Sequence, residues 1–238
     1  EPTVMNYRVL EERIKKAIDI REEGKLGKSR TFFESLILDI KKLLTKDPSP
    51  KLKNIYATAM GEYVIQHRLE ARQLNHEALN LGRKLLEYDR RHKLDNPLSI
   101  RSVSNTLLNI GGYEEAEDYV KGIIKLYRNN SGRQGDSEAH LAYIYLRTNR
   151  ITEADELISR AINHINRNTG HEHYVSIWLS HALMVKSLIN NAKVKPIEAL
   201  AAAEEALKVA KKDNRVFRIK QAEELVNFLK KKERIKAQ

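Results

Sequence analysis

Apolar residues recur at three- and four-residue spacing along almost the whole 238-residue chain. One such stripe contains Leu10, Ile14 and Ile18, and another contains Phe33, Ile37 and Ile40. This spacing places apolar side chains on one face of an α-helix. No convincing alternating strand pattern occurs, and 10 Gly and 5 Pro are few for the turns of an all-β chain. The sequence therefore predicts an all-α protein of about eleven helices.

The helical segments are separated by short clusters of turn and stop residues. Gly, Pro and Asn end helices because they take backbone conformations that a helix does not continue. Short breaks make consecutive helices antiparallel neighbours. The clusters are Gly24 to Gly27, Asp47 to Pro50, Asp95 to Pro97, Gly111 to Gly112, Asn129 to Gly135, Asn166 to Gly170, and Lys195 to Pro196.

A fixed order of small, turn, apolar, small and apolar residues recurs around several of these breaks. The successive steps are seven, two, three and four residues. The copies are Ser104, Gly111, Tyr113, Ala116, Val120; Ala142, Asn149, Ile151, Ala154, Ile158; Ala17, Gly24, Leu26, Ser29, Phe33; and Ser187, Val194, Pro196, Ala199, Ala203. The small residues allow two helices to approach closely, and the turn residue takes the left-handed conformation. The pattern predicts helical hairpins.

At this point the sequence resembles the tetratricopeptide repeat family. The stretches that carry the resemblance are "SIRSVSNTLLNIGGYEEAEDYVKGIIKLY" (99–127) and "SEAHLAYIYLRTNRITEADELISRAINHI" (137–165). Ala116 to Ala154 is 38 residues and Ala154 to Ala199 is 45, whereas the family repeat is roughly 34. The period is more similar to the extended repeats of kinesin light chain and bacterial peptide-sensing regulators.

The resemblance implies one right-handed superhelix, an α-solenoid, that covers residues 1–238 as a single domain. Ala78 in "NHEALNLGRKLLEYD" marks a further copy. We therefore expect five hairpins and a C-terminal capping helix. The expected hairpins are 1–47, 51–93, 97–130, 136–168 and 171–212, and the cap is 215–236.

Candidate binding residues follow from the family, in which the first helix of each hairpin lines a concave groove. Arg101 and Asn105 match the first half of a carboxylate clamp, but His140 stands where the next asparagine is expected. This departure argues against recognition of a chaperone C-terminus. An ordinary solvated face is the alternative for each residue. The implied groove residues are Arg101, Asn105, Leu108, Asn109, Tyr143, Arg147, His181, Met184 and Asn191, with Ala139, Leu146 and Leu188 beside them.

The formal charge of +11 is concentrated at the C-terminal end. Residues 208–238 contain 11 Lys and Arg against 4 Asp and Glu, a balance of +7, whereas the preceding residues contain 32 against 28. A basic end of this kind favours nucleic acid. However, an apolar stripe there predicts a helix packed on the last hairpin with its charges in water. The residues of this stripe are Val216, Phe217, Ile219, Ala222, Leu225, Val226 and Leu229.

Sequence motifs for metal binding, phosphate binding or catalysis are weak in this chain. The chain has no cysteine, which removes thiolate chemistry. His171-Glu172-His173 lacks the His-x-x-x-His spacing of a zinc site, and "NNSGRQGD" (129–136) has no preceding strand or following lysine for a phosphate. We expect that loop to be flexible, with Asp136 capping the next helix. No metal, cofactor or catalytic residue is predicted.

The leading hypothesis is a non-enzymatic scaffold that binds a peptide or helix of a partner protein in its groove. Nucleic-acid binding, a sensory module of a larger protein, and a hydrolase or transferase on a helical frame are the alternatives. No apolar run approaches the ~20 residues of a membrane span. The chain begins at Glu1 without a signal-peptide pattern, so a segment upstream stays possible. We expect a cytoplasmic protein, and the oligomeric state is open.

Overall fold

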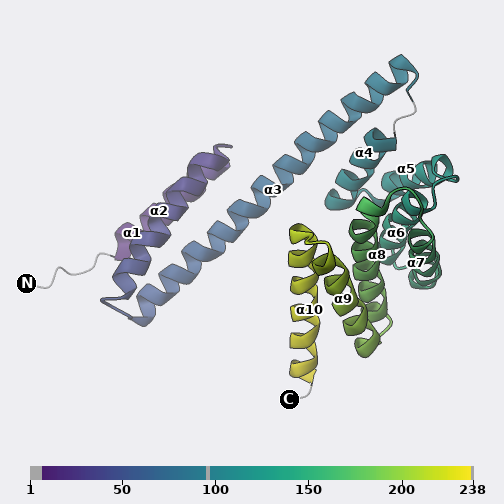
Figure 1. Ribbon diagram of the computed structural model, residues 1–238. Helices are drawn as coiled ribbons and strands as arrows, with labels where there is room; N and C mark the ends of the chain where they lie inside the picture. Colours follow the sequence, from purple (N-terminus) through teal and green to yellow (C-terminus); the bar gives the residue numbers. More distant parts are fainter. Residues whose placement is uncertain (1–6, 95–96, 237–238) are drawn as a thin grey trace, which may run out of the picture. The chain divides into compact units, whose positions relative to one another are not determined.

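A computed structural model describes residues 7–94 and 97–236, with side chains to Lys232 (Figure 1). All of its regular elements are helices, and none of the described residues forms a strand. The ten helices of this part are α1 (Tyr7–Glu22), α2 (Leu26–Leu44), α3 (Pro50–His92), α4 (Pro97–Ile110), α5 (Tyr113–Leu126), α6 (Ser131–Arg147), α7 (Ile151–Asn166), α8 (Glu172–Ala192), α9 (Pro196–Lys212) and α10 (Val216–Lys236). The predicted all-α class is confirmed, with ten helices where about eleven were expected.

The difference in number comes from α3, because the expected hairpin at 51–93 is wrong. These residues lie in one continuous helix of 43 residues. In the repeat pattern the turn precedes the second small residue by five positions, which places Gln73 at the turn before Ala78. Glutamine is a good helix former and does not favour the left-handed conformation. The chain therefore has no stop signal in the middle of α3.

Residue contacts divide the chain into two units, Glu1–Glu77 and Ala78–Gln238. In the first unit, α1 and α2 form a hairpin, and the first half of α3 adds to the same core. Phe33, Leu36, Ile40 and Leu52 are fully buried in it. Within this unit, the first half of α3 covers the apolar face that the α1–α2 hairpin would otherwise expose to water. That residues 1–238 form a single domain stays a prediction.

The predicted turn positions adopt the left-handed backbone conformation in all four copies of the pattern. The φ angles are +78° at Gly24, +84° at Gly111, +62° at Asn149 and +58° at Val194. After each turn residue, the next backbone N–H donates to a carbonyl five residues earlier, as Lys25 does to Ile20 at 3.2 Å. This bond closes the end of a helix in a Schellman motif. The repeat pattern therefore encodes four helix ends.

The small residues of the pattern lie where the two helices of each hairpin cross. Ala116 and Ala154 are fully buried. Ser29 donates a hydrogen bond from Oγ to the carbonyl of Ala17 at 2.8 Å, and Ser187 donates in the same way to Ala199 at 2.7 Å. A buried serine at these positions allows close approach and has its hydroxyl satisfied.

In the second unit, three hairpins stack in chain order. They are α4 with α5, α6 with α7, and α8 with α9, and α6 also packs on α8. One core runs through the stack and includes Val103, Ile144, Ile158 and Ile189, each fully buried. The first helices α6 and α8 therefore lie next to each other, and the side chain of Arg101 connects α4 to Asp136 of α6. This arrangement positions the site described below.

The start of α6 differs from the expected flexible loop at 129–136. The helix begins at Ser131, and Asn130 caps it by accepting from the backbone N–H of Arg133 at 3.1 Å. A Cβ at Gly132 would lie 2.3 Å from Oδ1 of Asn168, and one at Gly135 would lie 2.6 Å from the carbonyl of Ala161. The two glycines therefore serve close helix packing, and Asp136 lies inside the helix instead of capping it.

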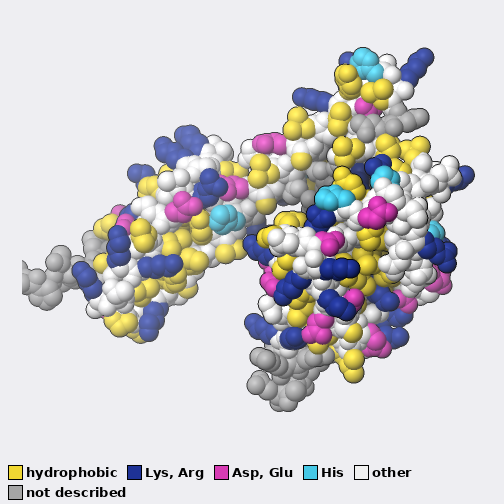
Figure 2. All heavy atoms as spheres, in the orientation of Figure 1, with side chains coloured by type: hydrophobic (Ala, Val, Ile, Leu, Met, Phe, Trp, Pro, Cys, Tyr) yellow, Lys and Arg dark blue, Asp and Glu magenta, His cyan; other side chains and the backbone are white. Residues whose placement is uncertain are grey.

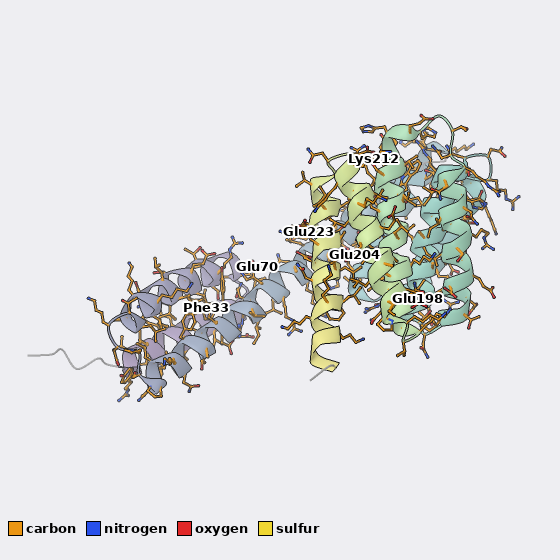
Figure 3. All side chains as sticks on the ribbon, turned by 60° about the horizontal axis from the view of Figure 1, so that its bottom comes forward. Phe33, Glu70, Glu198, Glu204, Lys212 and Glu223 are labelled. Atoms are coloured by element: carbon orange, nitrogen blue, oxygen red, sulfur yellow. The ribbon has the colours of Figure 1, made fainter. Side chains whose placement is uncertain are left out.

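The C-terminal helix α10 packs along α9, where Figure 3 shows Glu204 and Glu223. Lys230 pairs with Glu204 at 2.8 Å, and Lys211 of α9 pairs with Glu223 at 3.3 Å. Lys and Arg side chains are interspersed with Asp and Glu on the visible face of this unit (Figure 2). Part of the basic character is therefore compensated within the fold.

The apolar stripe predicted for α10 is correct in its C-terminal part only. Ala222 and Leu229 are buried, whereas Val216 and Phe217 are 69% and 70% exposed. These two side chains of the first turn of α10 therefore face solvent instead of the last hairpin.

Candidate ligand-binding groove

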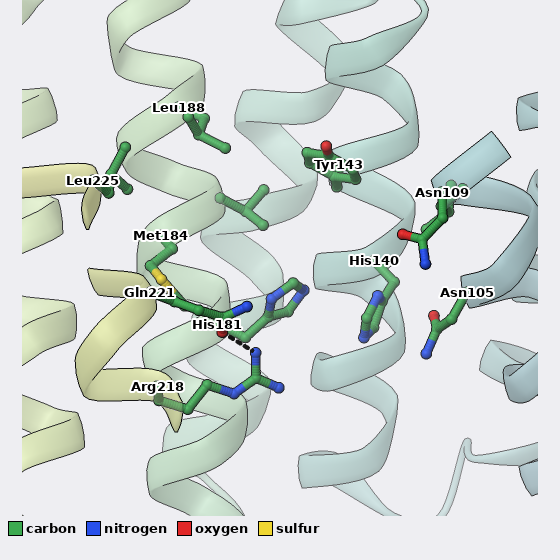
Figure 4. A pocket seen from close by; sticks show the side chains of 12 residues that line it. Asn105, Asn109, His140, Tyr143, His181, Met184, Leu188, Arg218, Gln221 and Leu225 are labelled. Atoms are coloured by element: carbon green, nitrogen blue, oxygen red, sulfur yellow. Dashed lines mark hydrogen bonds between the residues drawn. The ribbon is translucent and has the colours of Figure 1, made fainter. Parts of the chain in front are cut away.

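A pocket of about 410 Å³ opens between α4, α6, α8 and α10 of the second unit (Figure 4). We call it the central pocket. Helices α4, α6 and α8 are the first helices of the three stacked hairpins, and α10 closes the side next to α8. Its lining residues are Asn105, Leu108, Asn109, His140, Tyr143, His181, Met184, Val185, Leu188, Arg218, Gln221 and Leu225.

A second pocket, of about 320 Å³, lies along the same three first helices. We call it the aromatic pocket, because Tyr174 and Trp178 stack within it with ring centroids 5.7 Å apart. The guanidinium of Arg133 lies 5.5 Å from the ring centre of Tyr127 at its edge. Its lining residues are Leu98, Arg101, Tyr127, Arg133, Tyr174 and Trp178.

The two pockets belong to one continuous face of the helices. On α8 the lining residues Tyr174, Trp178, His181 and Leu188 follow three- and four-residue steps or their sums, which keeps them on one side of a helix. On α4, Arg101 of the aromatic pocket and Asn105 of the central pocket lie one turn apart on the same side of the helix. We call this face of α4, α6 and α8 the inner face.

A buried ion pair organises the middle of the inner face. Arg101 of α4 pairs with Asp136 of α6 at 2.5 Å, and Asp136 is only 2% exposed. Arg101 also lies with Nη2 3.3 Å from Nε2 of His140. Because the guanidinium only donates, this nitrogen of His140 accepts the hydrogen bond. A buried carboxylate requires such a partner, so Arg101 holds α4 against α6.

The two histidines of the central pocket are neutral at neutral pH. Burial lowers the pKa of His140 from 6.5 to about 3, helped by the charges of Arg101 and Arg218. Burial also lowers the pKa of His181 well below its ordinary value, with His140 as the next cause. An imidazole that is taken out of water loses hydration of its charged form. Arg218 is then the charged residue in the lining of the central pocket.

Arg218 reaches the pocket from α10, and its Nη1 donates to Oε1 of Gln221 at 2.9 Å (Figure 4). Leu108, Met184 and Leu225 contribute apolar surface to the same pocket. Nε2 of His181 and Oδ1 of Asn105 are buried and have no hydrogen-bond partner among the described residues. The pocket therefore offers an apolar wall, one cation and unused polar atoms.

The structure brings most of the predicted groove residues together around the central pocket. Arg101, Arg147 and Asn191 do not line it. Arg101 is held by Asp136, exposed Arg147 donates from Nε to the hydroxyl of Tyr113 at 3.1 Å, and Asn191 accepts from Nζ of Lys232 at 2.9 Å. Those that line the pocket are Asn105, Leu108, Asn109, Tyr143, His181 and Met184, together with Leu188. A role of these residues in binding stays a prediction.

Two corrections concern neighbouring residues. Ala139 does not face a groove but is fully buried in the core of the second unit. Leu146 is partly buried and packs against the same core. Both residues face the core side of α6. The expected set of groove residues on α6 therefore included two that do not face the groove.

Sequence reasoning missed the residues that α10 contributes. Arg218, Gln221 and Leu225 follow three- and four-residue steps, which is a signal for one helical face. The polar members of that face were read as part of the solvated side of a cap. His140 was noticed only as a departure from the family pattern, although it lies one turn before Tyr143 on the same face.

Other classes of site have little support in the described part of the chain. No three His, Cys, Asp or Glu side chains there lie close enough together to hold a metal ion. His171 precedes α8 without capping it through its side chain, and its ring lies 6.4 Å from that of Trp178. Among the described helices, none has the length and apolar character needed to cross a bilayer.

The fold of the second unit defines a class of protein built from stacked helical hairpins. No family model matches the chain, and no curated protein matches it. Solved structures similar to it are of the tetratricopeptide type. They include two crystal structures of nearly identical TPR-like repeats of a putative kinesin light chain from Podosopora anserina, one of them a point variant, and that of YrrB, described as a TPR protein with an unusual peptide-binding site.

The sequence identities and TM-scores of these structures are low, although they cover most of the chain. The point-variant structure is 16% identical, covers 89% of this chain and 99% of its own, and has a TM-score of 0.45. The other kinesin light chain structure is 16% identical, covers 85% of this chain and 96% of its own, and has a TM-score of 0.43. The YrrB structure is 15% identical, covers 88% of this chain and 90% of its own, and has a TM-score of 0.41. Similarity at this level carries no conclusion about function.

Proposed function

We propose that the second unit is a non-enzymatic protein-interaction module, and that its inner face binds an extended peptide segment or helix of a partner protein. The observation that carries this proposal is the continuity of the inner face. Two pockets lie along the same side of α4, α6 and α8, and on α4 one turn separates Arg101 of the aromatic pocket from Asn105 of the central pocket. A row of pockets suits a chain that places successive side chains in them.

The chemistry of the lining supports a peptide ligand. Asn105 and Asn109 lie on α4 one turn apart, and amide side chains bind the N–H and C=O groups of a peptide backbone. Tyr143, Met184 and Leu188 provide apolar contact surface, and large side chains of this kind carry much of the binding energy at interfaces. The described lining contains no cysteine, serine or threonine that could act as a nucleophile.

The experiment uses a random mixture of octapeptides with blocked ends and the immobilised full chain. Retained peptides are identified by mass spectrometry, and the most enriched one is then titrated. We expect Tyr143→Ala and Leu188→Ala to weaken its binding about tenfold each, the typical cost of truncating a central contact. Tyr119→Ala is the matched control, because Tyr119 lies on α5 and packs against the core without lining either pocket.

Two outcomes contradict the proposal. One is the absence of any peptide enriched over a blank support. The other is an enriched peptide whose affinity falls equally in the Tyr119 variant and in the inner-face variants.

A further inference from the structure

We propose that the segment bound in the central pocket carries an acidic side chain next to an aliphatic one, and that Arg218 holds the acidic side chain. This inference rests on the proposed function and names the chemistry of its ligand. It starts from an unmatched charge in the central pocket. The lining includes one arginine and no aspartate or glutamate.

Several partly or fully buried arginines of the fold pair with a carboxylate, and within the described part of the chain Arg218 does not. Arg21 pairs with Glu62 at 2.9 Å, Arg101 with Asp136 at 2.5 Å, and Arg150 with Glu117. Among the described side chains, no carboxylate forms an ion pair with Arg218, and its hydrogen bond goes to the neutral Gln221. A guanidinium taken partly out of water gains most from an anion that both of its nitrogens contact.

The surroundings of Arg218 leave its charge uncompensated. Burial lowers the pKa of Arg218, and the nearby charge of Asp136 raises it. That carboxylate is already engaged by Arg101. His140 and His181 are neutral, so they neither compete for an anion nor add a second positive charge. The pocket is therefore electrostatically complementary to one carboxylate.

The polar atoms without partners fit the same ligand. Nε2 of His181 is buried and, when it carries the ring proton, can donate to a carboxylate oxygen. Oδ1 of Asn105 is buried and can accept a peptide N–H. Met184, Leu188 and Leu225 form the apolar wall beside Arg218, which suits an aliphatic neighbour of the acidic residue.

The source of the carboxylate is a side chain within the segment. The inner face continues from the central pocket past Arg101 to the aromatic pocket. A ligand that follows this face passes through the central pocket without ending there. A terminal carboxylate is the competing source, and the experiment below separates the two.

Three octapeptide mixtures with blocked ends test the proposal. They are random except for a central Leu-Glu, Leu-Gln or Leu-Lys pair, and retention on the immobilised full chain is measured by mass spectrometry. We expect the Leu-Glu mixture to be retained about tenfold better than Leu-Gln, the size typical of one charge-assisted hydrogen-bonded contact. Arg218→Gln removes this preference, and Arg218→Lys restores part of it.

The control is Arg128→Gln, which makes the same change of charge at an exposed residue after α5. This variant should keep the preference for Leu-Glu over Leu-Gln if Arg218 in the pocket is responsible. It should lose that preference if only the net charge of the protein matters. Circular dichroism verifies that each variant is folded. The three methionines of the chain add a second readout, because a methyl label at Met184 reports on the central pocket and one at Met60 does not.

The outcomes separate the two proposals. Equal retention of all three mixtures, with binding still lost in Tyr143→Ala, overturns the acidic ligand and keeps the peptide groove. A Leu-Gln mixture with a free C-terminus that is retained like blocked Leu-Glu overturns the side-chain source. A preference for Leu-Glu that persists in Arg218→Gln overturns the role of Arg218. No retention of any mixture overturns both proposals.

Discussion

The rings of His140 and His181 stack with their centroids 4.4 Å apart and an interplanar angle of 30°. One ring comes from α6 and the other from α8, so the stack joins the first helices of two successive hairpins. It lies beside the Arg101–Asp136 ion pair and lines the central pocket. The two stacked histidines therefore link the stability of the second unit to the environment of the proposed ligand.

This stack makes folding sensitive to acid. The pKa of His140 is lowered from 6.5 to about 3 by burial and by the charges of Arg101 and Arg218, and the pKa of His181 is lowered in the same direction. Between about pH 3 and about pH 6.5, the histidine side chains bind protons in the unfolded chain but not in the folded chain. The free energy of unfolding therefore decreases as the pH falls from about 6.5 toward about 3.

Replacing His140 tests this linkage. We expect His140→Gln to show a smaller difference in the free energy of unfolding between about pH 7 and about pH 5 than the parent protein, because its share of proton uptake is gone. Urea titrations at the two pH values measure it. The control His76→Gln changes an exposed histidine of α3 and should keep the slope of the parent. Identical slopes for the parent and the His140 variant contradict the prediction.

Two glycines that lie inside helices should respond in opposite ways to alanine. At Gly135 a Cβ would lie 2.6 Å from the carbonyl of Ala161 and 2.9 Å from Cβ of His164, so α6 and α7 must separate. We expect Gly135→Ala to cost about 2 kcal/mol of unfolding free energy. At Gly122 no atom lies within 4 Å of the new Cβ, so Gly122→Ala should gain about 0.5–1 kcal/mol from helix propensity. Chemical denaturation of the pair measures both effects. No loss at Gly135 contradicts the close packing of α6 on α7, and a loss at Gly122 contradicts the open surroundings of that residue.

Val194 occupies a left-handed turn that disfavours it. Its φ is +58°, and the side chain is 73% exposed. A branched residue in this conformation costs about 1–2 kcal/mol, and no buried contact offsets the cost. We expect Val194→Gly to raise the unfolding free energy by about 1 kcal/mol, reduced by the added freedom of the unfolded chain. Val64→Gly is the control, because Val64 is an exposed residue inside α3 and its replacement should lower the melting temperature. A lower melting temperature for both variants contradicts the turn.

Much of the fold could be predicted because its signals are local. Gly24, Gly111, Asn149 and Val194 were identified as turns from residue type together with the repeat spacing, and each has positive φ. The position of Val194 is informative, because the repeat pattern predicted a turn at a residue that disfavours it. The same pattern failed at 51–93, where Ala78 imitated a repeat without a turn residue before it.

The site was predictable only in part, because it depends on packing between elements. Asn105, Tyr143 and His181 lie on the first helices and follow from helical spacing and the family resemblance. Arg218 lies in the pocket only because α10 packs against α8 and α9, and no local pattern encodes that contact. For the same reason, Arg101 could be placed on the inner face, but its engagement with Asp136 could not be foreseen.

The most direct test of the account is to locate a bound peptide on the second unit. The most enriched blocked octapeptide is irradiated with full-length protein that carries benzophenone-alanine in place of Tyr143 or, separately, of Tyr119, and adducts are counted by mass spectrometry. The inner-face account predicts a peptide adduct at position 143, suppressed by excess unlabelled peptide, and none at position 119. Adducts at position 119 alone, or equally at both positions, would contradict it.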